Sequence, residues 1–136
     1  MQVIKIAQVE KKPQTSPLFT GPVTSQSIVN PKLSQNFLIQ QVNFGRGVRN
    51  KFHTHSIEQV LIVTEGKGIV ATEKEEIAVG PGDVIFIAAG EKHWHGAAPG
   101  STFSHLYVMS PATKTAATED LDLPPSVPSL RKVTKV

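Results

Sequence analysis

The chain has 136 residues, of which 39% are hydrophobic and 18% charged, values typical of a single domain with one buried core. It contains no cysteine, which excludes disulfides, thiolate metal ligands and cysteine nucleophiles. The formal net charge is +3, and the basic residues are scattered except at Arg131, Lys132 and Lys135, which fit a solvated tail better than a nucleic-acid surface.

The first ten residues alternate apolar and polar side chains, without the basic start and continuous apolar run of a secretory signal. Within them, Val3, Ile4 and Ile6 predict an early strand whose free edge could pair with a second copy. The longest apolar stretch, Val84–Ala89, is too short to cross a bilayer. We therefore expect a cytoplasmic protein with neither nucleic acid nor a membrane as partner.

The middle of the chain predicts an all-β barrel or sandwich, because short β-branched or aromatic runs alternate there with glycine-bearing turns. Residues 11–35 and 111–136 are rich in proline and polar residues and predict irregular arms, so we expect one domain over 1–136 with a barrel core at about 37–110. The expected strands are Phe37–Phe44, Lys51–His55, Glu58–Thr64, Gly68–Thr72, Glu76–Val79, Asp83–Ile87, His93–Gly96 and Thr102–Met109.

All five histidines lie in these expected strands. Residues two apart on a strand point to the same face, so His53 and His55 present both imidazoles to one side, and Gln59 has the same parity. Two partly exposed histidines would explain this pair equally well. A second segment, Gly82 to His93, changes the balance because two glycine turns frame an apolar strand that delivers a further histidine. Three imidazoles and an amide oxygen would suit a divalent metal.

These two segments resemble the motifs of the cupin family. The first motif, G-x5-H-x-H-x3,4-E-x6-G, is matched at Gly47, His53, His55, Gln59 and Gly66, with glutamine in place of the usual glutamate. The second, G-x5-P-x-G-x2-H-x3-N, is matched at Gly82, Gly90 and His93, with Ala88 and Ala97 in place of proline and asparagine. The resemblance covers about residues 37–109 and implies a double-stranded β-helix, a jelly-roll-like barrel, with a metal inside it.

Gln59 changes the chemistry that the resemblance implies. A neutral amide leaves the full charge of a divalent ion uncancelled, which favours Lewis-acid chemistry and anionic ligands over redox cycling. Glu58 is the alternative ligand if a bulge after His55 reverses the parity of the strand.

Three residues near the expected site need separate interpretation. His95 shares the face of His93, whereas Trp94 points the other way and is expected to pack. His95 is either exposed at the barrel mouth or directed at the substrate. His105 lies among the apolar residues Phe103, Tyr107 and Met109, where it is either a buried structural histidine or a general base. We assign His105 and His95 as the candidate catalytic residues.

The segment from Gly90 to Pro99 also resembles a bacterial group of small cupins that includes manganese-dependent hydroxynitrile lyases. This resemblance implies His53, His55, Gln59 and His93 as ligands of a divalent ion, Mn(II) first, with Fe, Ni, Zn and Cu as alternatives. It also implies a small-molecule substrate, and small cupins are commonly homodimers or higher homo-oligomers. Two other functions stay open, namely an oxygen-activating dioxygenase and a non-catalytic module that binds a small ligand or the metal.

Overall fold

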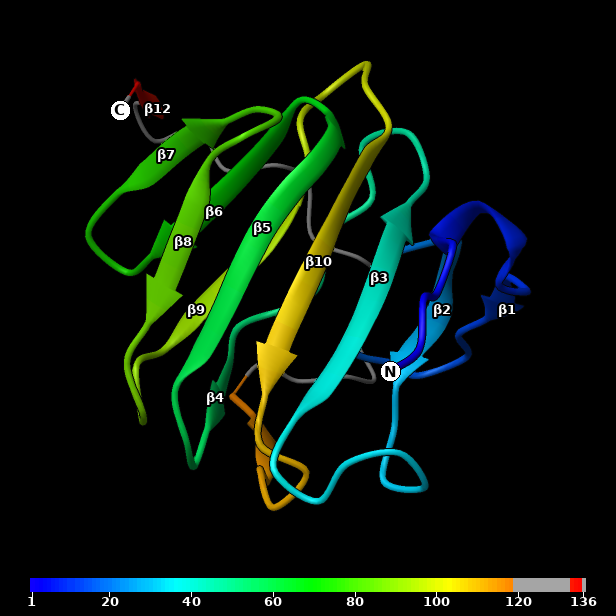
Figure 1. The fold of residues 1–136 in the computed structure, drawn as a ribbon. Coiled ribbons are helices and arrows are strands. Elements are labelled where there is room, and N and C mark those ends of the chain that lie inside the picture. The colour runs from blue at the N-terminus through cyan, green and yellow to red at the C-terminus, as the bar shows by residue number, and fades with distance from the viewer. Residues whose placement is uncertain (119–132, 136) are drawn as a thin grey trace.

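The computed structural model describes residues 1–118 and 133–135. Two six-stranded sheets face each other (Figure 1), in the orders β1-β2-β3-β10-β5-β8 and β11-β4-β9-β6-β7-β12. Neighbouring strands are antiparallel except β12 and β7, which are parallel. The strands are β1 Lys12–Pro13, β2 Val23–Val29, β3 Leu38–Phe44, β4 His53–His55, β5 Gln59–Gly66, β6 Gly68–Thr72, β7 Glu76–Val79, β8 Val84–Ile87, β9 His93–Ala97, β10 Phe103–Met109, β11 Thr115–Ala117 and β12 Val133–Lys135.

The eight predicted strands are confirmed, with ends that differ from the prediction by no more than two residues. The alternation of side chains places them correctly because one face of each strand must be buried between the sheets. Glycine turns separate them as expected. At Gly66 the backbone has a φ of 75°, and a Cβ there would collide with the carbonyl oxygen of Thr102, so the turn into β6 requires glycine.

The predicted arms are partly wrong. Val23–Val29 forms a strand that pairs with β3, and Thr115–Ala117 pairs with β4, although both lie in segments expected to be irregular. Residues 119–132 and 136 of the second arm lie outside the described residues, and with them Arg131 and Lys132 of the basic cluster.

The early strand predicted at Val3, Ile4 and Ile6 is also wrong. A three-residue 3₁₀ turn, η1 (Ile6–Gln8), begins there, and Val3 is exposed. The side-chain amide of Gln26 donates to the carbonyl oxygens of Ile6 and Val9, so a side chain satisfies carbonyls that a strand would offer to a neighbour. The homo-oligomer that this strand would support stays a prediction.

The two faces of the sheet that contains β3 and β10 differ in character. The inner face carries apolar side chains, among them Val42, Phe44 and Phe103, which pack in the core between the sheets. On the outer face, Gln41 and Asn43 join a polar layer in which amide and hydroxyl groups bond one another. In the part of the chain that the structure describes, no helix is long and apolar enough to cross a membrane.

Candidate metal centre

Three histidines from two adjacent strands converge between the sheets. His53 and His55 lie on β4, and His93 opens β9 directly opposite His53 in the antiparallel register. Their candidate ligand atoms all lie within 4.8 Å of one another, and the three side chains are buried. Among the residues described here, this converging group contains no carboxylate. The same-face prediction for the histidine pair and its partnership with His93 is therefore confirmed.

Each of the three imidazoles is oriented through its Nδ1 atom. The carbonyl oxygen of Lys51 lies 2.7 Å from Nδ1 of His53, and that of Glu91 lies 2.8 Å from Nδ1 of His93. A carbonyl oxygen only accepts, so both Nδ1 atoms carry the proton. The Thr115 hydroxyl, 2.9 Å from Nδ1 of His55, can accept a third such bond. The Nε2 atoms are left with free lone pairs.

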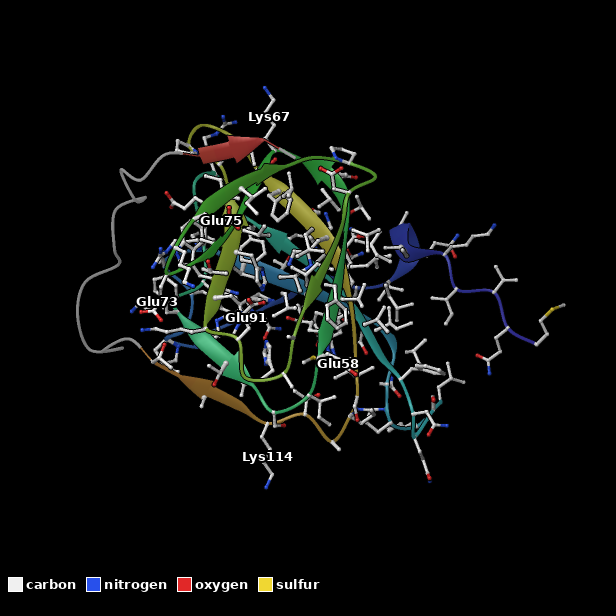
Figure 2. All side chains as sticks on the ribbon, turned by 90° about the vertical axis from the view of Figure 1, so that its left-hand side faces the viewer. Glu58, Lys67, Glu73, Glu75, Glu91 and Lys114 are labelled. Atoms are coloured by element: carbon white, nitrogen blue, oxygen red, sulfur yellow. The ribbon has the colours of Figure 1, made fainter. Side chains whose placement is uncertain are left out.

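Gln59 faces the histidines from the opposite sheet. It is the first residue of β5 and is 4% exposed, and its amide nitrogen lies 3.8 Å from the sulfur of Met109. Its Oε1 atom is buried without a hydrogen-bond partner. Glu58, the alternative ligand, is exposed at the surface (Figure 2) and lies in the connection between β4 and β5, whereas Gln59 is buried. The geometry therefore favours Gln59 over Glu58.

Burial keeps these imidazoles neutral. It lowers the pKa of His53 to about 3 and that of His55 to about 4, and the positive charge that a protonated His93 would carry adds to both effects. Burial also lowers the pKa of His93, although the Glu91 carbonyl and carboxylate oppose this. At neutral pH the Nε2 lone pairs are thus available to a cation.

The donor set fits a divalent metal. The Nε2 atoms of His55 and His93 and the Oε1 atom of Gln59 are all buried without a hydrogen-bond partner. Leaving three such groups unsatisfied in a folded interior costs about 1–3 kcal/mol each. A divalent ion bound by these neutral nitrogen and oxygen atoms would satisfy all three groups at once. His53, His55, His93 and Gln59 are therefore the residues that could hold it.

His95 and His105 form a second pair of imidazoles beside the triad. His95 is 4% exposed and its ring centre lies 5.8 Å from those of both His53 and His93, so it is not exposed at the barrel mouth. His105 lies on the opposite sheet, fully buried, with its Nε2 atom 3.2 Å from Nδ1 of His95. Burial lowers the pKa of His105 to about 4 and that of His95 well below its usual value. His95 thus contacts both His105 and two of the candidate metal ligands, His53 and His93.

A comparison with protein families covers the segment that contains these residues. The model of the cupin domain matches residues 41–109, which include every candidate ligand and both further histidines. The chain belongs to the cupin family.

Relatives of this cupin include a protein of known activity. The (R)-mandelonitrile lyase of Granulicella tundricola is 46% identical over 69 residues, which are 50% of this chain and 53% of that protein. The chain thus spans about half the length of this curated relative. A cupin-like protein from Thermotoga maritima is 30% identical, with a TM-score of 0.73 over 82% of this chain and 89% of that one.

A more distant structure shows the same fold. The polyketide cyclase RemF from Streptomyces resistomycificus superposes with a TM-score of 0.75 at 22% identity, covering 88% of each chain.

The structure of this cupin also contains residues that the sequence did not single out. Thr115 reaches His55 from β11, and Asn50 contacts His95. Both come from segments without a motif, so only their spatial neighbours identify them. Trp94 behaves as predicted: it is 1% exposed and packs with Ile69 and Ala71 in a separate cluster.

Proposed function

We propose that this cupin is a metal-dependent hydroxynitrile lyase that cleaves or forms cyanohydrins. Two observations carry the proposal together: the 46% identity to (R)-mandelonitrile lyase over 69 residues, and the buried triad of imidazoles that this chain holds. When bound, a divalent ion, for which Mn(II) is our first candidate, would act as a Lewis acid on an oxygen or nitrile group of the substrate.

The reaction requires a proton to leave and return. In cleavage the substrate hydroxyl loses its proton, the carbon–carbon bond to the nitrile breaks with its electron pair on cyanide, and the proton is returned to give hydrogen cyanide and a carbonyl compound. We assign the transfer of this proton to His95 and His105, because both imidazoles are neutral at pH 7 and are hydrogen-bonded to each other at 3.2 Å. His95 is the member that lies beside the metal-ligand candidates.

Apolar side chains around His105 support this role in proton transfer by limiting the access of water. The His105 ring lies 5.6 Å from the ring centres of both Phe44 and Phe103, and both phenylalanines are at most 2% exposed. An apolar wall strengthens electrostatic interactions at the site and restricts the exchange of the held proton with solvent.

Gln59 distinguishes this proposal from oxygen chemistry. A neutral fourth ligand leaves the charge of the ion available to a substrate alkoxide or to cyanide, whereas glutamate would cancel part of it. This argument supports a lyase over the dioxygenase alternative.

The proposal is tested by mandelonitrile cleavage, followed as benzaldehyde release, with the protein reconstituted with Mn(II). We expect cleavage that a chelator abolishes and that added Mn(II) restores. His105→Gln should lose turnover by about 10²-fold or more while keeping its metal, since a positioned acid–base group contributes that much. Full turnover in this variant, or oxygen uptake on phenolic or diketone substrates without any cyanohydrin cleavage, would contradict the proposal.

A further inference from the structure

Asn50 forms three hydrogen bonds with His95. It lies in the segment before β4 that runs beside β9, and it is 3% exposed. Its backbone N–H donates to the carbonyl oxygen of His95 at 3.0 Å. Its side-chain Oδ1 accepts the backbone N–H of His95 at 2.8 Å, and its Nδ2 lies 3.2 Å from Nε2 of the His95 ring.

These contacts determine which way the Asn50 amide points. A backbone N–H only donates, so the group that faces the His95 N–H must be the oxygen Oδ1. The amide nitrogen Nδ2 therefore faces the His95 ring and donates to its Nε2. A neutral imidazole that accepts at Nε2 carries its proton on Nδ1. Asn50 thus fixes the tautomer of His95.

The donor-to-acceptor direction of these hydrogen bonds continues from His95 into His105. With its proton on Nδ1, His95 donates to Nε2 of His105 across 3.2 Å. His105 must then carry its own proton on Nδ1, which lies 3.1 Å from the carbonyl oxygen of Leu106. That oxygen only accepts, so the far end of the chain independently requires the same direction as the Asn50 end. The two assignments agree.

We propose that Asn50 is a positioning residue that sets the direction of a hydrogen-bond chain running from its amide through His95 and His105 to the Leu106 carbonyl. The tautomers follow from geometry alone, and their catalytic consequence rests on the proposed lyase function. In this arrangement both acceptor lone pairs of the two rings are occupied. A proton taken from the substrate must displace one of these bonds, so the direction of the chain decides which ring nitrogen can receive it.

Asn50→Asp is the sharpest perturbation. A carboxylate keeps the bond from the His95 backbone N–H, but its second oxygen only accepts, so it requires a proton on Nε2 of His95. The variant should reverse the chain at its first link with little change in shape. Asn43→Asp is the matched control, because Asn43 is a half-buried amide of the outer polar layer that bonds Thr24, Gln26 and Ser104.

The test is the imidazole ¹⁵N–¹H long-range correlation spectrum of histidine-labelled protein, metal-free and loaded with Zn(II). His95→Gln and His105→Gln assign the signals. We expect the Nδ1–H tautomer for both His95 and His105 in the wild type and in Asn43→Asp, and Nε2 protonation of His95 in Asn50→Asp. The wild-type spectrum is decisive even if Asn50→Asp fails to fold, because an Nε2–H tautomer of His95 there would overturn the proposal.

Kinetics separate this inference from the proposed function. Asn50→Asp should lower kcat for mandelonitrile by about 10²-fold with KM near the wild-type value, since wrongly placed protons impair acid–base catalysis rather than binding. An unchanged kcat in an Asn50→Asp protein with reversed tautomers would contradict the catalytic role of Asn50. A wild-type protein with the expected tautomers but no cyanohydrin cleavage would instead contradict the lyase function and leave the tautomer assignment in place.

Discussion

Acid should destabilise the metal-free protein through His105, and the size of the effect follows from its burial. The pKa of His105 falls from 6.5 to about 4 on folding. Between these values the unfolded chain binds a proton that the folded chain does not, so stability falls as the pH drops through 6.5 and levels off below about 4. At pH 5 the loss from this one group is about 2 kcal/mol relative to neutral pH, and below pH 4 it reaches about 3 kcal/mol.

Urea unfolding of chelator-treated protein at pH 7.5 and pH 5.0 measures this loss. The comparison is between wild type and His105→Gln, because a cost of the substitution that does not depend on pH cancels when the two pH values are subtracted. The wild type should lose about 2 kcal/mol more than the variant. Equal losses in the two proteins would show that His105 is not held neutral by the fold, and the assignment of a buried neutral imidazole would fail.

Three further substitutions test separate parts of the structure. Thr115→Val should weaken Mn(II) binding by about 10- to 100-fold in competition with a chelating dye, because the Nδ1–H of His55 loses its acceptor, whereas Thr115→Ser should bind normally. Gly96→Ala should lower the free energy of unfolding by about 1–3 kcal/mol or more, because its Cβ would lie 2.6 Å from the Val48 carbonyl oxygen, whereas Gly80→Ala, with nothing within 4 Å, should unfold like the wild type. Gln59→Glu should bind Mn(II) more tightly and cleave mandelonitrile about tenfold more slowly, and faster cleavage would contradict the role given to the neutral amide.

Much of the barrel and the triad could be predicted because both depend on strand parity. His53 and His55 are two residues apart, and burial of one strand face is enough to place both imidazoles together. The partnership with His93 needed more than parity, because it depends on which strands become neighbours. The glycine-framed motif supplied that information, and the register confirms it by pairing His53 directly with His93.

The parts that could not be predicted are those that depend on tertiary neighbours. Val23–Val29 (VTSQSIV) has β-branched residues at both ends, but the polar residues Ser25, Gln26 and Ser27 interrupt them. The segment becomes a strand where it pairs with β3. The roles of Thr115 and Asn50 could not be predicted for the same reason. A threonine in a proline-rich arm and an asparagine in a loop acquire their roles only when folding brings them to His55 and His95.

The wrong strand at the N-terminus has a related cause. Three apolar residues near the start of the chain produce an alternating pattern, but a strand also needs a partner for its backbone. Here the side-chain amide of Gln26 donates hydrogen bonds to the carbonyl oxygens of Ile6 and Val9 instead.

Metal stoichiometry tests the central claim most directly. Protein dialysed against Mn(II) and then freed of unbound ion should contain one equivalent per chain by elemental analysis, and His93→Ala should contain almost none, while Glu58→Ala should match the wild type. Full metal content in His93→Ala, or its loss in Glu58→Ala together with retention in Gln59→Ala, would contradict the assignment of His53, His55, His93 and Gln59 as the metal ligands.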